Sequence, residues 1–352
     1  MRVCLFGTYE RGYPRNAQVI SCLRGAGVQV HEEHVSVWED SRQAWRAGPV
    51  RALRLAAAEL QLLARRPVDA DALLVGYPGH FDLPAARRAA RGRPVVFNPL
   101  VSLADTLVAD RRRFRPNTPV ARLLEAIDRR AFRAADRVVA DTAAQAAFFA
   151  QLAGLDEVPV CYVGAEERLF NPVWQRPEQF VALFVGKLIP LQGLETILGA
   201  AKLAPELSFR LVGSGQLDRL LHQRTPNVEH VPWVEYERLP GEIARAGCVL
   251  GIFGTSGKAK RVIPNKAFQA LACAAPLVTG DTPAARELLT DGETALLVPP
   301  GNPEQLADAI RRIAADPALA ERLAAGGRAA YEREASEAVL GRRWRGIIER
   351  LL

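Results

Sequence analysis

Short apolar runs alternate with longer amphipathic stretches along the first half of the 352-residue chain. The apolar runs that predict strands are residues 2–6, 72–76, 94–97 and 137–140. The stretches that predict helices lie at about 15–26, 43–66, 83–91, 117–134 and 142–153. This alternation is typical of a parallel sheet with crossover helices.

The second half repeats the scheme. Its predicted strands are residues 180–185, 208–212, 248–253 and 276–279. Its predicted helices lie near 194–203, 214–222, 237–246, 265–273 and 283–289. We therefore predict an α/β protein of two doubly wound, Rossmann-like domains.

The boundary between these domains is expected near residues 170–177, where two prolines interrupt both helical and strand continuation. This divides the chain into domains 1–172 and 173–335. Beyond residue 303 the pattern is purely helical, with stretches at 303–315, 317–332 and 336–351. The last helix either packs back on the first domain or forms a dimerisation surface, and the sequence does not decide between these.

Composition indicates an ordinary globular protein, with 49% hydrophobic and 24% charged residues. No apolar run approaches 18 residues, so we expect neither a membrane span nor an export signal. The five cysteines are odd in number and far apart, which argues against a disulfide framework or a zinc site. We expect them to be buried thiols of a cytoplasmic protein.

All five lysines lie between Lys187 and Lys266, although the other 41 of the 46 basic residues are arginines spread along the chain. All but Lys202 sit in or beside turns rich in Gly and Pro. A lysine is a compact charge on a flexible stem and can reach a phosphate from such a turn. The pattern suggests an anionic ligand in the second half; arginine-rich composition with chance clustering is the alternative.

The residues that follow the second-half strands carry this signal, because open α/β sheets bind ligands beyond the carboxyl ends of their strands. Gly186 and Lys187 follow one strand, where backbone N–H groups and a cation suit a phosphate. Gly213 and Gly215 follow the next, although a tight turn needs such glycines in any case. Residues 258–266 hold four positive charges. They predict an unburied segment, either a solvated loop or an anion cradle.

The order of these motifs resembles that of the retaining glycosyltransferases of family 4. The resemblance rests on Gly186-Lys187, Gly213-Ser-Gly215, Val231-Pro-Trp233-Val234, Ile263-Pro-Asn-Lys266-Ala-Phe-Gln269 and Pro283-Ala-Ala-Arg-Glu287. It continues through Ala295-Leu-Leu-Val-Pro-Pro300 and reaches back to Val163-Gly-Ala-Glu, and so covers residues 160–315. It implies the GT-B fold, in which two Rossmann-like domains face a cleft, followed by C-terminal helices.

The resemblance also implies a retaining transfer from a nucleotide diphosphate sugar, without a metal or other cofactor. It places Lys187 on the donor diphosphate, Gly213 and Gly215 beside the nucleotide, and Trp233 and Val234 at the nucleobase. The remaining residues it assigns to donor binding are Gly186, Asn265, Lys266 and Gln269. Of these, Gln269 stands at the second acid of the family's Glu-x7-Glu motif.

The chain departs from the family pattern at three positions. Arg261 stands at the first acid, Gln269 at the second, and Gln192 at a second phosphate-binding lysine. We interpret this as a positively charged variant in which Lys187, Lys258 and Arg261 stabilise the leaving diphosphate. The alternative is a nucleotide-sugar binding protein with little or no turnover. A nicotinamide-dependent oxidoreductase ranks last, because the first strand lacks the Gly-x-Gly-x-x-Gly turn.

In the first domain the strand ends offer contacts to the acceptor or the transferred sugar. The candidate residues are Arg11, Gly12, Tyr13, Arg15, His80 and Asn98. For each arginine a surface loop is an equal alternative, and a lone histidine is more often a structural hydrogen-bonding residue. The acceptor class stays open among sugars, lipids and small molecules.

Arginine clusters at 87–93 and 111–115 make the first half the more basic one. Two interpretations stand: peripheral contact with an anionic membrane at its inner face, and solvated helix faces. Nucleic acid is not an expected partner, because no aromatic stacking platform accompanies the charge. The Asp69-Ala-Asp71 sequence precedes a strand, so we expect a solvated strand entrance there and no metal site.

Overall fold

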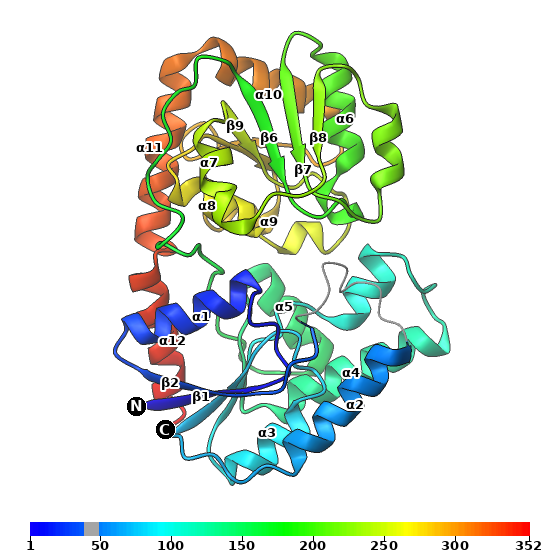
Figure 1. Cartoon of the computed structure of the whole chain (residues 1–352), viewed down its shortest axis with the longest axis vertical. Helices are drawn as coiled ribbons and strands as arrows, with labels where there is room; N and C mark the ends of the chain where they lie inside the picture. The colour runs from blue at the N-terminus through cyan, green and yellow to red at the C-terminus, as the bar shows by residue number, and fades with distance from the viewer. Residues whose placement is uncertain (39–48) are drawn as a thin grey trace. The chain divides into compact units, whose positions relative to one another are not determined.

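The computed structural model describes residues 1–38 and 49–352. The chain forms two compact units (Figure 1). The first consists of Met1–Val108, Arg113–Val163 and Glu337–Leu352, and the second of Ala109–Arg112 and Gly164–Ser336.

The first unit is built on a five-stranded parallel sheet in the order β2-β1-β3-β4-β5. Its strands are β1 (Arg2–Gly7), β2 (Gln29–His34), β3 (Ala72–Val75), β4 (Val95–Phe97) and β5 (Arg137–Val138). The central strands β3 and β4 are buried along their whole length. Continuous apolar runs suit such strands, because helices cover both faces of a parallel sheet.

Helices of the first unit are α1 (Pro14–Gly25), α2 (Pro49–Leu63), α3 (Leu83–Ala90), α4 (Pro119–Ala134), α5 (Ala143–Ala153) and α12 (Glu337–Glu349). A short π-helix, η1, runs Asp105–Asp110. Of the helix predicted at 43–66, positions 43–48 lie outside the described residues.

The C-terminal helix α12 packs against α1 (Figure 1). A Cβ added at Gly341 would lie 2.4 Å from Cys22 O, so the two helices touch at backbone distance there. Ser21 Oγ donates to Glu337 Oε2 over 3.0 Å. The last helix of the chain therefore belongs to the first unit.

The second unit holds a six-stranded parallel sheet in the order β11-β10-β9-β6-β7-β8. Its strands are β6 (Val181–Val185), β7 (Ser208–Val212), β8 (Val228–Val231), β9 (Cys248–Leu250), β10 (Leu277–Gly280) and β11 (Leu296–Val298). The core between this sheet and its helices includes Phe184, Phe209, Leu211 and Phe253.

Helices of the second unit are α6 (Leu194–Leu203), α7 (Leu239–Ala244), α8 (Asn265–Ala272), α9 (Pro283–Arg286), α10 (Pro303–Ala315) and α11 (Pro317–Glu334). Four short 3₁₀ helices join them: η2 (Pro190–Gln192), η3 (Asp218–Gln223), η4 (Tyr236–Arg238) and η5 (Ala259–Arg261). Side chains of Thr282, Asn302 and Asp316 cap α9, α10 and α11, each with a proline just inside the helix.

Every predicted strand is present, and β2, β8 and β11 are additional. The helix predicted at 214–222 is instead the 3₁₀ segment η3, and those at 237–246 and 283–289 shorten to α7 and α9. All five cysteines are buried, as predicted. Among the described residues, none of the helices has the length and apolar composition that a membrane crossing requires.

Candidate functional site

The residues expected to bind the donor follow four neighbouring strands of the second sheet. Lys187 follows β6, Gly213 follows β7, Trp233 follows β8, and the basic segment 254–266 follows β9. The strand order β9-β6-β7-β8 makes these positions adjacent. Because parallel strands end at the same sheet edge, the fold brings these residues to one edge of the second unit.

Two glycines at this edge are required by packing. Gly213 has φ of 133°, and a Cβ there would lie 2.0 Å from Gly186 O. A Cβ on Gly215 would lie 2.4 Å from Leu188 O. The turn after β7 thus rests directly on the backbone of the turn after β6. Close packing accounts for both glycines without a ligand.

The basic segment 258–266 is partly buried, which corrects the expectation that it is an unburied element. Lys258 is 6% exposed and Lys266 is 5% exposed, whereas Lys187 and Lys260 are exposed and Arg261 is intermediate. Burial arises because η5 packs through Ala259 and Val262 onto Ile252, and α8 begins directly afterwards. At this edge Lys187 is therefore exposed, Arg261 is half-buried, and Lys258 and Lys266 are buried.

The Lys266 ammonium contacts only neutral groups among the described residues. Its Nζ donates to Gln192 Oε1 over 2.6 Å and to Gly251 O over 3.4 Å. It also lies 3.4 Å from the centroid of the Phe184 ring. Burial lowers the pKa of Lys266 well below its usual value.

Gln269, at the position of the family's second acid, belongs to a cluster of polar side chains that the sequence did not predict. Its Nε2 lies 3.4 Å from Tyr236 Oη, and Tyr236 also hydrogen-bonds Glu166. Burial and the Glu166 charge raise the pKa of Tyr236. Arg168 in turn pairs with Glu166 over 2.9 Å. The buried carboxylate of Glu166 is thus connected to Gln269 through Tyr236. In the sequence, Glu166 is marked only by its place in the motif at 163–170.

Trp233 and its neighbours present a different chemistry at the end of β8. The Trp233 side chain is a large apolar group that is 53% exposed, and its Nε1 donates to Glu235 Oε1 over 3.2 Å. Val234 and Asn265 are both partly exposed. An exposed indole at a sheet edge is suited to contact a flat, aromatic ligand group.

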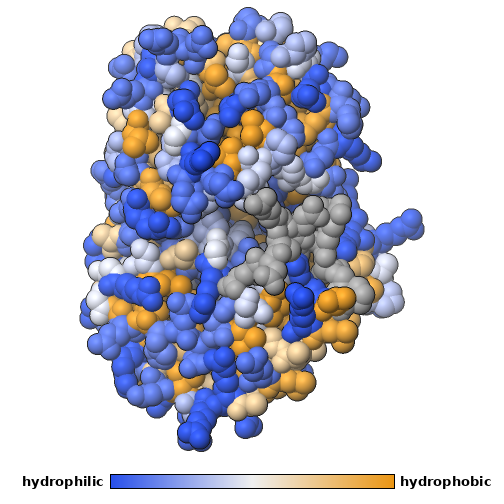
Figure 2. All heavy atoms as spheres, in the orientation of Figure 1, coloured by the Kyte–Doolittle hydropathy of each residue, from blue (hydrophilic) through white to orange (hydrophobic). Residues whose placement is uncertain are grey.

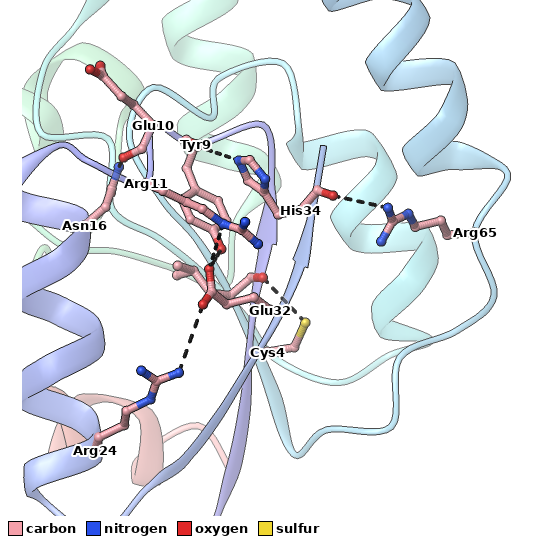
Figure 3. Close-up of polar contacts among 10 residues, drawn as sticks. Cys4, Tyr9, Glu10, Arg11, Asn16, Arg24, Glu32, His34 and Arg65 are labelled. Carbon is pink, nitrogen blue, oxygen red and sulfur yellow. Dashed lines mark hydrogen bonds and ion pairs between the residues drawn. The ribbon is translucent and has the colours of Figure 1, made fainter. Parts of the chain in front are cut away.

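In the first unit, Arg11 belongs to a cluster around Glu32 (Figure 3). Arg11 Nε lies 3.2 Å from Glu32 Oε2, and Tyr9 Oη donates to the same oxygen. Arg24 approaches the other carboxylate oxygen at 4.0 Å. Glu32 therefore balances much of the positive charge expected of Arg11. Gly12 nearby is exposed, and the Tyr13 ring lies 4.7 Å from that of Tyr77.

Arg15 and Asn98 lie in the interior of the first unit, which corrects their assignment as ligand contacts. They are 0% and 1% exposed, and Arg15 Nε donates to Asn98 Oδ1 over 3.1 Å. Arg15 Nη1 also donates to Tyr162 O, and the guanidinium lies 5.3 Å from the Trp344 ring centroid. This arginine links α1, β4 and α12.

His80 likewise has a structural position. Its side chain is 0% exposed, and Nε2 lies 3.3 Å from Asp128 Oδ1. The ring packs edge-on against Phe97, with centroids 5.2 Å apart. The structure thus favours the structural alternative over an acceptor contact. At the strand entrance, Arg2 holds both acids of Asp69-Ala-Asp71, through its guanidinium and its backbone N–H.

Comparison with known proteins finds a family match within the second unit. Residues 179–316 match the family model described as Glycosyl transferases group 1. A phosphatidyl-myo-inositol mannosyltransferase of Mycobacterium leprae is 29% identical over 161 residues, 43% of this chain and 41% of that protein. A D-inositol 3-phosphate glycosyltransferase of Kribbella flavida is 31% identical over 243 residues, 61% of this chain and 55% of that protein. The chain thus spans about half the length of these relatives.

Solved structures share the fold of the whole chain. Sucrose-phosphate synthase from Thermosynechococcus elongatus superposes with a TM-score of 0.77 at 17% identity, covering 100% of this chain and 99% of that one. Anabaena HepE in complex with UDP-glucose gives 0.71 at 18% identity, covering 99% and 100%. The prediction of two parallel-sheet α/β domains of the GT-B class is confirmed.

Proposed function

Because residues 179–316 match the family model described as Glycosyl transferases group 1, we propose that the chain is a glycosyltransferase with a nucleotide diphosphate sugar as donor. The observation that carries the proposal is the edge of the second sheet, where Arg261, Lys187 and Trp233 follow β9, β6 and β8 of the consecutive strands β9-β6-β7-β8. The names of the relatives and the UDP-glucose complex of HepE agree with it. In this proposal residues 173–335 are the donor domain and residues 1–172 are the acceptor domain, on which the helix at about 336–352 packs.

The mechanism we propose is a retaining transfer that needs no metal. The bond from sugar C1 to the diphosphate oxygen breaks first, and negative charge grows on that oxygen. The acceptor hydroxyl then attacks C1 from the same face, and its proton passes to the diphosphate. Lys187 and Arg261 stabilise the leaving diphosphate, and each well-placed group lowers the barrier by about 3 to 4 kcal/mol. We assign the third cation of this role to Lys258, which is buried at the start of η5.

Donor binding would use the other residues of the same edge. Trp233 and Val234 would meet the nucleobase, and the backbone at Gly186, Gly213 and Gly215 would approach the phosphates. Gln269 would hold the ribose hydroxyls as a neutral hydrogen-bonding partner. Asn265 would contact the donor beside it.

We infer that the acceptor is a molecule at an anionic membrane surface. Val50, Leu53 and Leu60 lie on one face of α2 and are 65%, 71% and 69% exposed. Figure 2 shows apolar side chains gathered where α2 runs in Figure 1. Arg54 is exposed on the same helix. Exposed apolar groups with flanking arginines suit the interface of an anionic bilayer, reached from the cytoplasm. Arg11, Gly12 and Tyr13 would contact the acceptor.

The test is a panel of nucleotide sugars, measured both by thermal shift and by release of nucleoside diphosphate. A glycosyltransferase should release the diphosphate slowly in water and faster with an acceptor. The replacement of both motif acids by Arg261 and Gln269 favours a second candidate, a nucleotide-sugar binding protein. That candidate is supported if one donor raises the melting temperature and stays intact. If none binds, both functions fail.

A further inference from the structure

Lys266 is the second residue of α8, and its side chain points into the second unit. The three groups it contacts are an amide oxygen, a backbone carbonyl and an aromatic ring. The two oxygens accept hydrogen bonds and the ring attracts a cation, but none of the three groups carries the negative charge that normally accompanies a buried ammonium. An apolar side chain would fill the same space without this cost. The lysine is therefore unexplained by packing.

The other titratable groups around α8 have partners other than Lys266 or carry the same charge. Tyr236 contacts Gln269 of α8 and hydrogen-bonds Glu166, which pairs with Arg168. Arg328 of α11 donates to Ala272 O and pairs with Glu332, and Asp281 after β10 pairs with Arg286. Lys187 follows β6, and Lys258 and Arg261 follow β9. In the described part of the chain no carboxylate contacts Lys266, and burial is the cause of its lowered pKa.

The position of the ammonium relates it to the proposed diphosphate site. A Cβ on Gly186 would lie 3.0 Å from Lys266 Nζ, so the ammonium sits against the Gly186–Lys187 turn. Its partner Gln192 belongs to the segment that follows the same strand. In the family that the sequence resembles, a second phosphate-binding lysine stands at position 192. In this chain Lys266 of α8 supplies the cation, and its ammonium donates to Gln192, the residue that stands at that position.

We propose that Lys266 binds the donor diphosphate and that this binding is coupled to protonation of the Lys266 side chain. An anion at the Gly186–Lys187 turn supplies the missing negative charge, so its binding takes up a proton at Nζ. This inference rests on the proposed function. An anion favours the protonated form, so the bound state holds the proton to higher pH than the free state does. Between these two limits, affinity falls by up to tenfold for each unit of rising pH.

The experiment uses the five lysines of the chain as reporters. With ¹³Cε-lysine labelling, each lysine gives one NMR signal, and the signal missing from Lys266→Arg identifies Lys266. Titration of the free protein should show this signal changing well below about pH 10.4, the pKa of a lysine side chain in a model peptide. Adding UDP-glucose or GDP-mannose should move that transition to higher pH. The phosphates of these donors do not titrate near neutral pH.

Calorimetry in buffers of different ionisation enthalpy then measures proton uptake on binding. We expect up to one proton per donor in the wild type and in the Lys202→Met control, and none in Lys266→Met. A Lys266 transition that stays in place on donor binding, or uptake that persists in Lys266→Met, overturns the inference. If no nucleotide sugar binds, the proposed function fails. Sodium pyrophosphate then decides the inference alone, and a Lys266 signal that it leaves unmoved refutes it.

Discussion

His80 Nε2 lies 3.3 Å from Asp128 Oδ1, and both side chains are 0% exposed. Ser102 Oγ donates to the same carboxylate, as do the backbone N–H groups of Leu103 and Ala104. Asp128 of α4 thereby holds the turn after β3 and the loop after β4. The pair explains why a histidine occurs in a glycine-rich turn: it anchors the first unit from inside.

Replacing this histidine should affect folding more than ligand binding. His80→Ala leaves a buried carboxylate without one partner and removes a ring that packs against both Phe97 and Phe132. We expect the free energy of unfolding of the first unit to fall by about 3 kcal/mol. Urea unfolding followed by circular dichroism measures this, with the exposed His222→Ala as control. A stable His80→Ala protein without turnover would instead indicate a catalytic role.

The same carboxylate predicts how stability depends on acid. Burial raises the pKa of Asp128, but hydrogen bonds from His80, Ser102 and Ala104 outweigh it, and the pKa lies below its usual value. The ionised form therefore stabilises the fold above the unfolded-state pKa of about 3.9. This contribution is lost as pH falls through the folded-state pKa. Asp128→Asn should be less stable than the wild type at neutral pH, and its stability should fall less than that of the wild type below about pH 4. If the melting temperatures of the wild type and of Asp128→Asn changed with pH in the same way, this prediction would be wrong.

The strands that the sequence did not predict share one property: β2, β8 and β11 all lie at sheet edges. An edge strand is half exposed and need not be apolar. The β2 sequence Gln-Val-His-Glu-Glu-His is almost entirely polar, and β8 is Val-Glu-His-Val. The β11 sequence Leu-Leu-Val is apolar but only three residues long. The strands of the sheet interiors were predictable because burial on both faces demands continuous apolar runs.

The candidate site was predictable where it depended on strand ends and not where it depended on long-range packing. Lys187 comes just after the predicted strand 180–185, so the strand prediction fixed its place. Trp233 follows β8, which was not predicted, and its place came from the motif order alone. The contact between Lys266 and Gln192 joins residues 74 positions apart. Charge alone predicted exposure for Lys266, and burial by α8 overrode it. The same holds for Arg15, whose partner Tyr162 is 147 residues away.

Arg15 provides a test of how α12 is held on the first unit. Arg15→Ala removes hydrogen bonds to Asn98 and Tyr162 and the contact with Trp344. We expect unfolding free energy to fall by about 3 kcal/mol, because buried polar partners lose their donor. Hydrogen exchange should rise in α12, whereas the exposed control Arg350→Ala leaves it unchanged. Unaltered exchange in α12 would show that Arg15 does not hold this helix.

Lys187 and Arg261 should contribute more to the transition state than to donor binding. If they stabilise charge that grows on the leaving diphosphate, Lys187→Ala and Arg261→Ala each lower kcat more than they weaken nucleoside diphosphate binding. A loss of about 100-fold in kcat corresponds to the weakest well-placed donor group. Lys260→Ala is the matched control, since Lys260 is exposed on η5 next to Arg261. Equal losses in kcat and affinity would mean that these residues only hold the donor.

Lys266 should cost stability in the absence of a donor. Burial lowers its pKa in the folded state, so the unfolded chain binds more protons between that pKa and about 10.4, and stability rises with pH in this window. Below the window the cost is constant. Lys266→Met should therefore be more stable than the wild type at pH 7, by about 1 to 3 kcal/mol, and the difference should shrink as pH rises. Saturating donor should reverse the order, because it stabilises the wild type alone. A Lys266→Met protein less stable at pH 7 would show that the hydrogen bond to Gln192 outweighs the burial of the charge.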